Sequence, residues 1–267
     1  MSRALAGARR LAGRDMRARV RRGGISWDLD LREGIDLYIY LAGRFEWRLS
    51  RILTSLVRPG DTIVDVGANV GAHALPLARA AGVDGRIFAY EPTGFAYGKL
   101  LANIALNPDL ASRIVPVQAM LIGEAGGPPA PAIASSWPLV TADDLHPEHR
   151  GRAMSTVGAR AVTLDEHLRE AGVPRVALMK IDVDGFECSV LRGAAGILGA
   201  CRPLIVMEWA PYLHEAAGHD LQTCLSVVRD LGYSFHDAGS GEALPADLAT
   251  VARRSAPGVS INVVGRA

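Results

Sequence analysis

Apolar residues recur along the chain in two alternating spacings, and this alternation predicts the fold class. Short runs rich in apolar residues predict strands at 62–66, 86–90, 114–121, 176–181 and 204–207. Apolar positions at helical spacing predict helices at 46–57, 72–81, 93–107, 163–171, 187–198 and 221–231. Strands that alternate with helices favour right-handed crossovers, so we expect a doubly wound α/β domain with a mainly parallel sheet.

The ends of the pattern are less regular. A weak alternation at 26–31 predicts a short strand, and the runs 233–235 and 260–264 predict an edge pair that would bring the sheet to seven strands. Residues 123–160 are rich in Gly, Pro, Ser and Ala and carry no clear element, so we expect an insertion that acts as a lid. We predict an N-terminal extension, residues 1–24, followed by one domain over residues 25–267.

Composition and charge narrow the class of protein. A formal net charge of +1 gives no electrostatic reason to expect nucleic acid as a partner. The sequence contains neither a secretory apolar region nor an apolar run near the ~20 residues of a transmembrane segment. The three cysteines lack a C-x-x-C pair, so we expect packed thiols and a cytoplasmic protein. Residues 1–24 hold eight arginines, which predicts a frayed or surface helix, with a membrane-surface or polyanion contact as the alternative.

A glycine-rich turn follows the strand predicted at 62–66. Its glycines, Gly67 and Gly71, permit a tight turn and let a ligand approach the main chain. Glu91 ends the next strand, twenty residues after Gly71, where a carboxylate suits a bidentate grip on a ribose diol. The unit therefore predicts a nucleoside site.

The charge of the turn indicates which nucleoside binds. The G-x-G-x-x-G pattern of dinucleotide sites is absent, because Asn69 stands between glycines spaced G-x-x-x-G. A pyrophosphate would be repelled by Asp65, whereas the ammonium and sulfonium groups of S-adenosylmethionine would be attracted by it. A nicotinamide-dependent oxidoreductase and a catalytically silent nucleoside-binding module stay open as alternatives.

A second polar cluster, residues 180–187, follows the strand predicted at 176–181. Asp182 here and Glu208 after the next strand should meet at the sheet edge where open α/β folds bind ligands. Either carboxylate, or His214, is a candidate general base that would remove the proton from an alcohol substrate. Asp182 and Glu208 would also suit Mg²⁺, but no third ligand is evident, so we favour a reaction without metal.

Three further side chains are candidates for contact with the acceptor. His73 follows the glycine turn, with packing or helix capping as its alternative. Trp137 lies in the irregular segment, where its ring could stack on a sugar or anchor the core. Trp209 comes directly after Glu208.

The order of these motifs resembles the FkbM family of methyltransferases. The similarity covers about residues 29–208 and rests on IDLYIYLAGRFEW, VDVGANVGAHALPLA, FAYEP, VTLDEHL, LMKIDVDGFECSVLRGA and RPLIVMEW. It implies a class I methyltransferase fold, which is Rossmann-like, and S-adenosylmethionine as the methyl donor. It further implies O-methylation of a hydroxyl group on a sugar, a polyketide or another small metabolite. Asp184 departs from the family, which more often has glutamate there, and residues 123–160 match poorly.

The resemblance also implies roles for individual residues. The residues expected to line the methionine part of the donor are Gly67, Ala68, Asn69 and Gly71. Glu91, with Pro92 beside it, would hold the ribose, and Met120 would border the adenine. Asp182 would lie beside the methyl group. The acceptor itself, O- against N-methylation and the oligomeric state, a homodimer included, stay open.

Overall fold

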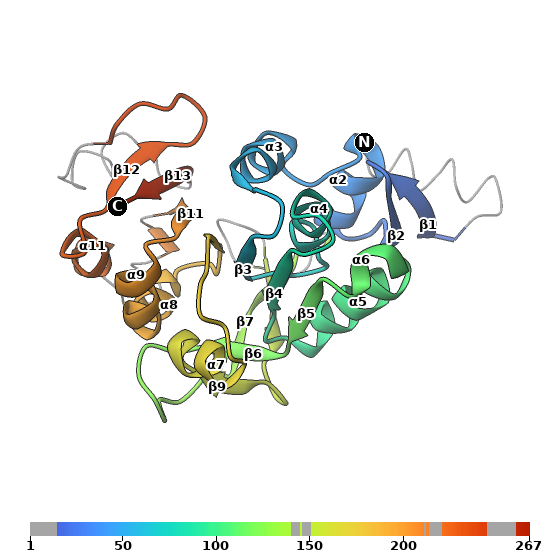
Figure 1. Cartoon of the computed structure of the whole chain (residues 1–267). Coiled ribbons are helices and arrows are strands. Elements are labelled where there is room, and N and C mark those ends of the chain that lie inside the picture. Colours follow the sequence, from blue (N-terminus) through green and yellow to red (C-terminus); the bar gives the residue numbers. More distant parts are fainter. Residues whose placement is uncertain (1–14, 140–144, 146–150, 211, 214–220, 245–259) are drawn as a thin grey trace.

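The computed structural model describes residues 15–139, 145, 151–210, 212–213, 221–244 and 260–267. Its centre is a seven-stranded sheet in the order β12-β13-β11-β10-β3-β4-β5 (Figure 1). The strands are β3 (Thr62–Val66), β4 (Arg86–Tyr90), β5 (Ile114–Val117), β10 (Leu178–Ile181), β11 (Leu204–Trp209), β12 (Ser234–Asp237) and β13 (Ile261–Arg266). The strands from β5 to β11 are parallel, and β13 pairs antiparallel with β11 and β12. The predicted doubly wound, mainly parallel α/β sheet is confirmed.

Helices cover both faces of this sheet because its buried strands carry apolar residues on each side. In β3, Ile63 packs into the core under α3 (Trp47–Leu56), α4 (Ala74–Ala80), α5 (Gly94–Ala105) and α6 (Pro108–Ala111). Its neighbour Val64 packs into the opposite core, with α7 (Leu164–Glu170), α8 (Glu187–Gly193), α9 (Ala195–Cys201) and α11 (Leu221–Arg229). The single helix predicted at 187–198 is instead two helices, α8 and α9. Contrary to the expectation of packed thiols, Cys188 in α8 is disulfide-bonded, whereas Cys201 is free.

The N-terminal part corrects one prediction. Within the arginine-rich segment, residues 17–22 form strand β1 (Arg17–Arg22) rather than a helix. Its side chains alternate at the strand period of two, with Ala18 buried between exposed arginines, and it pairs antiparallel with β2 (Ile25–Asp30). The boundary that we expected between an N-terminal extension and the domain, after residue 24, falls where the hairpin turn meets β2. Helix α2 (Gly34–Ala42), which the apolar pattern did not predict, follows.

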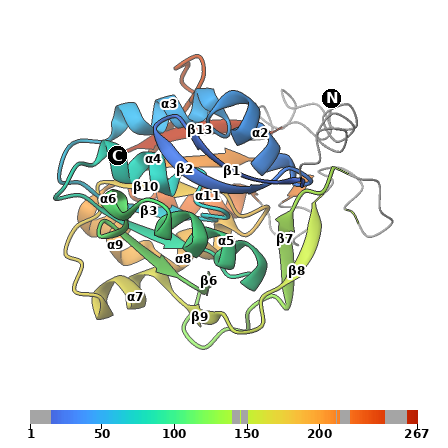
Figure 2. The ribbon, with the colours of Figure 1, turned by 90° about the vertical axis from the view of Figure 1, so that its right-hand side faces the viewer.

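The irregular segment contains strands that the sequence pattern did not reveal. β7 (Ala132–Ser136) and β8 (Arg152–Ser155) form an antiparallel hairpin, which Figure 2 shows beside α5. The strand predicted at 114–121 is divided, because β6 (Ala119–Leu121) leaves the main sheet and pairs with β9 (Arg160–Val162). Pro116, which lacks a backbone donor, precedes the division. Residues 140–144 and 146–150 of this segment lie outside the described part of the chain.

Candidate functional site

A cavity of about 360 Å³ opens at the carboxyl ends of the parallel strands. Its size falls within the ~300–1,000 Å³ range of small-molecule sites. One side is lined by Gly67, Glu91 and Asp182, which directly follow β3, β4 and β10, and by Glu208 near the carboxyl end of β11. The other side comes from the α2–α3 loop and from the segment that carries Trp137.

The turn after β3 brings backbone close to this cavity. Gly67 has a φ of 75°, and a Cβ at this position would lie 1.9 Å from the carbonyl oxygen of Asp182, so only glycine fits. Asn69 also has a left-handed backbone, with a φ of 48°, and its amide side chain donates to the Ser135 carbonyl over 3.2 Å. Ala68 lines the cavity as expected. Gly71 lies behind it, where an added Cβ would lie 3.0 Å from Leu100, and so shapes the turn.

The Glu91 carboxylate lies at the end of β4 and is buried by its neighbours. Oε1 accepts hydrogen bonds from the Thr93 backbone (3.0 Å), the Thr93 hydroxyl (2.6 Å) and the Ser135 hydroxyl (3.3 Å), whereas Oε2 accepts one from the Asn69 backbone (3.1 Å). Burial raises the pKa of Glu91, and these hydrogen bonds oppose the shift. The carboxylate is thereby held in one orientation on the cavity wall, next to Pro92.

Lys180 is a buried cation in the polar cluster of residues 180–187, and the sequence pattern predicted no role for it. Its ammonium donates to the carbonyl oxygens of Val66 (3.3 Å) and Gly67 (3.0 Å). It also lies 3.4 Å from Asp65 Oδ1 and 3.3 Å from Asp182 Oδ2. Burial alone would lower the pKa of Lys180, but the two carboxylates outweigh it and raise the pKa, so the side chain stays charged.

This pairing changes the expected position of Asp65. Its carboxylate is fully buried beside Lys180 and does not line the cavity, whereas Asp182 does. Asp65 is therefore not placed to contact a ligand in this cavity, and its neighbour is Lys180. A lysine at a buried strand position was the signal that could have revealed the arrangement, because an unpaired ammonium is costly there.

Carboxylates dominate the rest of this wall. Asp184 has a left-handed backbone with a φ of 49°, and burial, followed by repulsion from Asp182, raises its pKa well above the ordinary value. Burial and the same repulsion raise the pKa of Glu208 to about 9. Burial raises the pKa of Glu187, behind the wall, to about 7. Several carboxyl groups thus lie close together on the cavity wall, and a cationic ligand would stabilise their ionised forms.

The opposite wall holds His73 and Glu46. The His73 side chain is only 4% exposed, and neither ring nitrogen has a hydrogen-bond partner. His73 Nε2 lies 3.7 Å from Glu46 Oε2, and the Phe45 ring packs against the imidazole at a centroid distance of 6.0 Å. Glu46 adopts a left-handed backbone with a φ of 40°. The sequence pattern did not indicate Glu46 as a site residue, because only the tertiary fold places its side chain beside His73.

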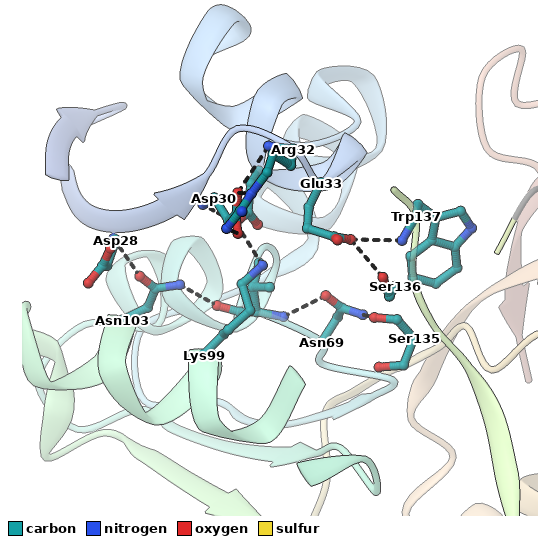
Figure 3. Close-up of polar contacts among 12 residues, drawn as sticks. Asp28, Asp30, Arg32, Glu33, Asn69, Lys99, Asn103, Ser135, Ser136 and Trp137 are labelled. Atoms are coloured by element: carbon teal, nitrogen blue, oxygen red, sulfur yellow. Dashed lines mark hydrogen bonds and ion pairs between the residues drawn. The ribbon is translucent and has the colours of Figure 1, made fainter. Parts of the chain in front are cut away.

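Trp137, which lines the cavity, is held in place by polar contacts with the N-terminal segment (Figure 3). The Glu33 carboxylate accepts hydrogen bonds from the Trp137 backbone (2.9 Å) and the Ser136 hydroxyl (3.0 Å). The Gly34 backbone donates in turn to the Trp137 carbonyl over 2.8 Å. The α2 segment and the β7 segment therefore form one polar framework around this tryptophan.

The remaining predicted residues are distributed differently. Met120 lines a second, small apolar cavity of about 20 Å³, which shares Gly67 and Pro92 with the first. Trp209 is 1% exposed and packs in the core against Phe235, at a ring distance of 5.2 Å, rather than lining the cavity. His214 lies outside the described residues. Within the described part of the chain, no group of three or more His, Cys, Asp or Glu side chains is placed to hold a metal ion.

These features suit the chemistry of S-adenosylmethionine. Several carboxylates line the cavity and would attract a sulfonium or an ammonium group, and the Glu91 carboxylate is available to accept hydrogen bonds from hydroxyl groups. The apolar cavity beside Met120, at about 20 Å³, is too small for an adenine, so it shows only that the surface next to the first cavity is apolar here. In the part of the chain that the structure describes, no helix has the length and apolar character needed to cross a membrane.

Comparison with known proteins gives a family match over most of the chain. The model of the methyltransferase FkbM domain matches residues 65–235. The hexuronic acid methyltransferase AglP of Haloferax volcanii is 26% identical over 166 residues, which cover 61% of this chain and 62% of that protein. Methyltransferase sdnD of Sordaria araneosa is 31% identical over 174 residues, which cover 56% of this chain and 66% of that protein. The chain thus matches less than two thirds of the length of either relative.

Among solved structures, the methyltransferase FkbM from Methylobacillus flagellatus aligns at 15% identity with a TM-score of 0.44. The alignment covers 81% of this chain and 50% of that one.

Proposed function

The chain belongs to the FkbM family of S-adenosylmethionine-dependent methyltransferases, and from this premise we propose that it transfers a methyl group to a hydroxyl group of a small, uncharged acceptor. The observation that carries the proposal is the carboxylate-lined cavity at the carboxyl ends of β3, β4, β10 and β11. Family membership sets aside the nicotinamide-dependent oxidoreductase. A silent module of the same fold is an alternative that an activity assay decides.

For the donor, we propose that Glu91 binds the ribose diol while the backbone of Gly67, Ala68 and Asn69 borders the methionine part. The fixed orientation of the Glu91 carboxylate supports this role, because it accepts four hydrogen bonds from its neighbours. Met120 would border the adenine. When bound, the donor supplies an electrophilic methyl group on a sulfonium, which departs as a neutral thioether.

Two roles are open to Asp182 and Glu208, as general base or as charges that favour the sulfonium. We propose the second role. Asp182 is ion-paired with Lys180 at 3.3 Å, and burial raises the pKa of Glu208 to about 9, so Glu208 holds a proton at neutral pH until a cation binds. Neither group needs Mg²⁺ for this role.

For the acceptor, we propose an uncharged sugar or a similar hydroxyl-bearing metabolite. The flat ring of Trp137 on the cavity wall suits stacking on a sugar face. One relative is named for a hexuronic acid, which carries a carboxylate. Among the described lining residues the permanent cation is Lys180, which is already paired, so this cavity offers an acidic sugar little charge complementarity.

Binding and turnover test the proposal separately. Calorimetry should show that the purified chain binds S-adenosylmethionine. A panel of neutral glycosides and their uronic acid counterparts is then incubated with the donor, and mass spectrometry scores a 14 Da gain. We expect gains confined to neutral compounds. Gains confined to the uronic acids would contradict the acceptor class, and donor binding without turnover of any compound would favour the silent module.

A further inference from the structure

We infer that His73 is the catalytic base that removes the acceptor proton, and that Glu46 is the positioning residue that orients and balances its charge. This inference rests on the proposed function and assigns the proton transfer in the same cavity. Both side chains line the cavity, and they reach it from different segments of the chain. His73 closes the turn after β3, whereas Glu46 precedes α3.

The first observation is the state of the imidazole. His73 is 4% exposed, and both ring nitrogens are buried without a hydrogen-bond partner. Buried polar groups normally find partners, and one that lacks them on a cavity wall has capacity to bond a ligand. Because both nitrogens are buried in the ligand-free fold, the ring must turn toward the cavity before an entering hydroxyl can supply that bond.

The second observation is the neighbour. Glu46 Oε2 lies 3.7 Å from His73 Nε2, and this is the ion-pair contact of His73 among the described residues. At 3.7 Å the carboxylate is too far for a hydrogen bond, but its charge favours the imidazole tautomer that carries its proton on Nε2 and leaves Nδ1 free to accept one. It also stabilises the imidazolium that forms. With Nε2 turned to Glu46, the accepting atom is Nδ1.

The third observation is the backbone. Non-glycine residues with a left-handed φ are Glu46, Asn69, Asp184 and Arg202 in the part of the chain that the structure describes. The first three line the cavity. A non-glycine residue keeps such a conformation only when its surroundings impose it, and such residues concentrate at functional sites. The conformation of Glu46 is therefore consistent with a side chain that is aimed at His73.

In the methyl transfer, the O–H bond of the acceptor breaks and its proton passes to His73 Nδ1. A lone pair of the acceptor oxygen forms the new bond to the methyl carbon. The carbon–sulfur bond of the donor breaks, and its electron pair stays on sulfur. The proton on the imidazolium leaves to solvent after the product departs. No oxidant or metal is required.

A rival role for His73 is to bind the carboxylate of the donor's methionine part. Glu46 argues against it, because an anion placed at the imidazole would also face that carboxylate. The two roles differ in what a substitution changes. Loss of a base lowers kcat, whereas loss of a carboxylate partner weakens donor binding.

The first experiment needs no acceptor. Histidine-¹⁵N-labelled protein is saturated with S-adenosylhomocysteine, and His73→Gln assigns the His73 signals. We expect the ¹⁵N chemical shifts of the wild type to place the ring proton on Nε2, and Glu46→Gln to weaken this preference. A ring proton on Nδ1, or a preference that Glu46→Gln leaves unchanged, would overturn the inference. Glu170→Gln is the matched control, since this exposed carboxylate pairs with Arg160 on the surface.

The second experiment uses the panel glycoside that gains 14 Da fastest. His73→Gln and His73→Asn should lower kcat by about 10²–10⁴-fold while the donor Kd stays unchanged. Glu46→Gln should lower kcat less and leave both the KM for the glycoside and the donor Kd unchanged, a separation that a purely structural role would not produce. Unchanged kcat, or equal losses in donor affinity and rate, would overturn the inference. Wild-type protein that fails to bind the donor would instead contradict the proposed function.

Discussion

The proposed donor side of the cavity is built from strand ends, whereas the proposed acceptor side is assembled from segments far apart in the sequence. On the donor side, Gly67, Glu91 and Asp182 each follow a parallel strand of one sheet, so the sheet alone brings them together. On the acceptor side, the α2–α3 loop and the β7 segment must both dock onto the domain before Glu46 and Trp137 reach the cavity.

The two sides also differ in how their polar groups are satisfied. On the donor side, Lys180 and Glu91 are held by ion pairs and hydrogen bonds within the protein. On the acceptor side, the Glu33 carboxylate holds Trp137 and Ser136, but the ring nitrogens of His73 lack hydrogen-bond partners among the described residues. We therefore expect His73 to gain its hydrogen bond from the ligand. Substitutions on the two sides should therefore separate stability and donor binding from acceptor turnover.

The largest expected effect is that of Lys180→Met on stability. It leaves Asp65 buried and Asp182 nearby without their shared cation, and removing one partner of a buried ion pair costs about 3–5 kcal/mol of unfolding free energy. The loss should grow as pH rises, because a buried carboxylate that has lost its cation costs less to bury when protonated, whereas the raised pKa keeps Lys180 of the wild type charged throughout.

Urea denaturation measures this loss. The double variant Lys180→Met, Asp65→Asn should recover part of it, since the unpaired carboxylate is then gone. A single variant within about 1 kcal/mol of wild type would contradict the idea that the donor side depends on this pair.

Glu91→Ala should come next and should act on the donor. Losing a charged hydrogen-bond partner of the ribose should weaken S-adenosylmethionine binding by about 2–3 kcal/mol. Calorimetry measures the change, with circular dichroism to verify the fold, because Glu91 also accepts bonds from Thr93, Ser135 and Asn69. A folded variant with wild-type affinity would remove Glu91 from the donor site.

Glu208 should make stability depend on pH. In the ligand-free fold it keeps its proton up to about pH 9, whereas an ordinary glutamate releases it near pH 4.5. Between these values the folded state binds more protons than the unfolded state, so stability should fall as pH rises, by at most about 1.4 kcal/mol per pH unit.

Glu208→Gln should flatten this slope without abolishing it, since the pKa of Asp184 is raised as well. Urea midpoints at pH 5, 7 and 9 measure it. Saturating S-adenosylmethionine should also flatten the slope, because a bound cation favours the ionised carboxylate. A slope that neither change affects would contradict the acidic character of the donor side.

The smallest expected effect is that of Glu33→Ala, on the acceptor side. It removes the acceptor for the Trp137 backbone and the Ser136 hydroxyl, which should cost about 1–2 kcal/mol of stability. It should raise the KM for the panel glycoside and leave the donor Kd unchanged, since the donor side forms independently. An equal loss in donor affinity would mean that the two sides are one unit.

Local sequence determined much of this protein because several features depend on neighbouring residues. The apolar runs at 62–66 and 86–90 coincide with β3 and β4, since buried parallel strands need continuous apolar residues. The G-x-x-x-G spacing placed the turn at Gly67, where only glycine fits against the Asp182 carbonyl. The proximity of Asp182 and Glu208 followed from the rule that parallel strands end at one edge.

Tertiary structure decided the features that depend on distant segments. The arginines of β1 offered no periodicity strong enough to predict a strand, and pairing with β2 provides the hydrogen bonds that stabilise it. Three contacts each join segments that are far apart in the sequence, so the local pattern could not predict them. They are Asp65 with Lys180, Trp209 with the core residue Phe235, and Glu46 with His73. Sequence patterns report which face of an element is apolar, but which polar groups meet in a cavity depends on how those faces pack.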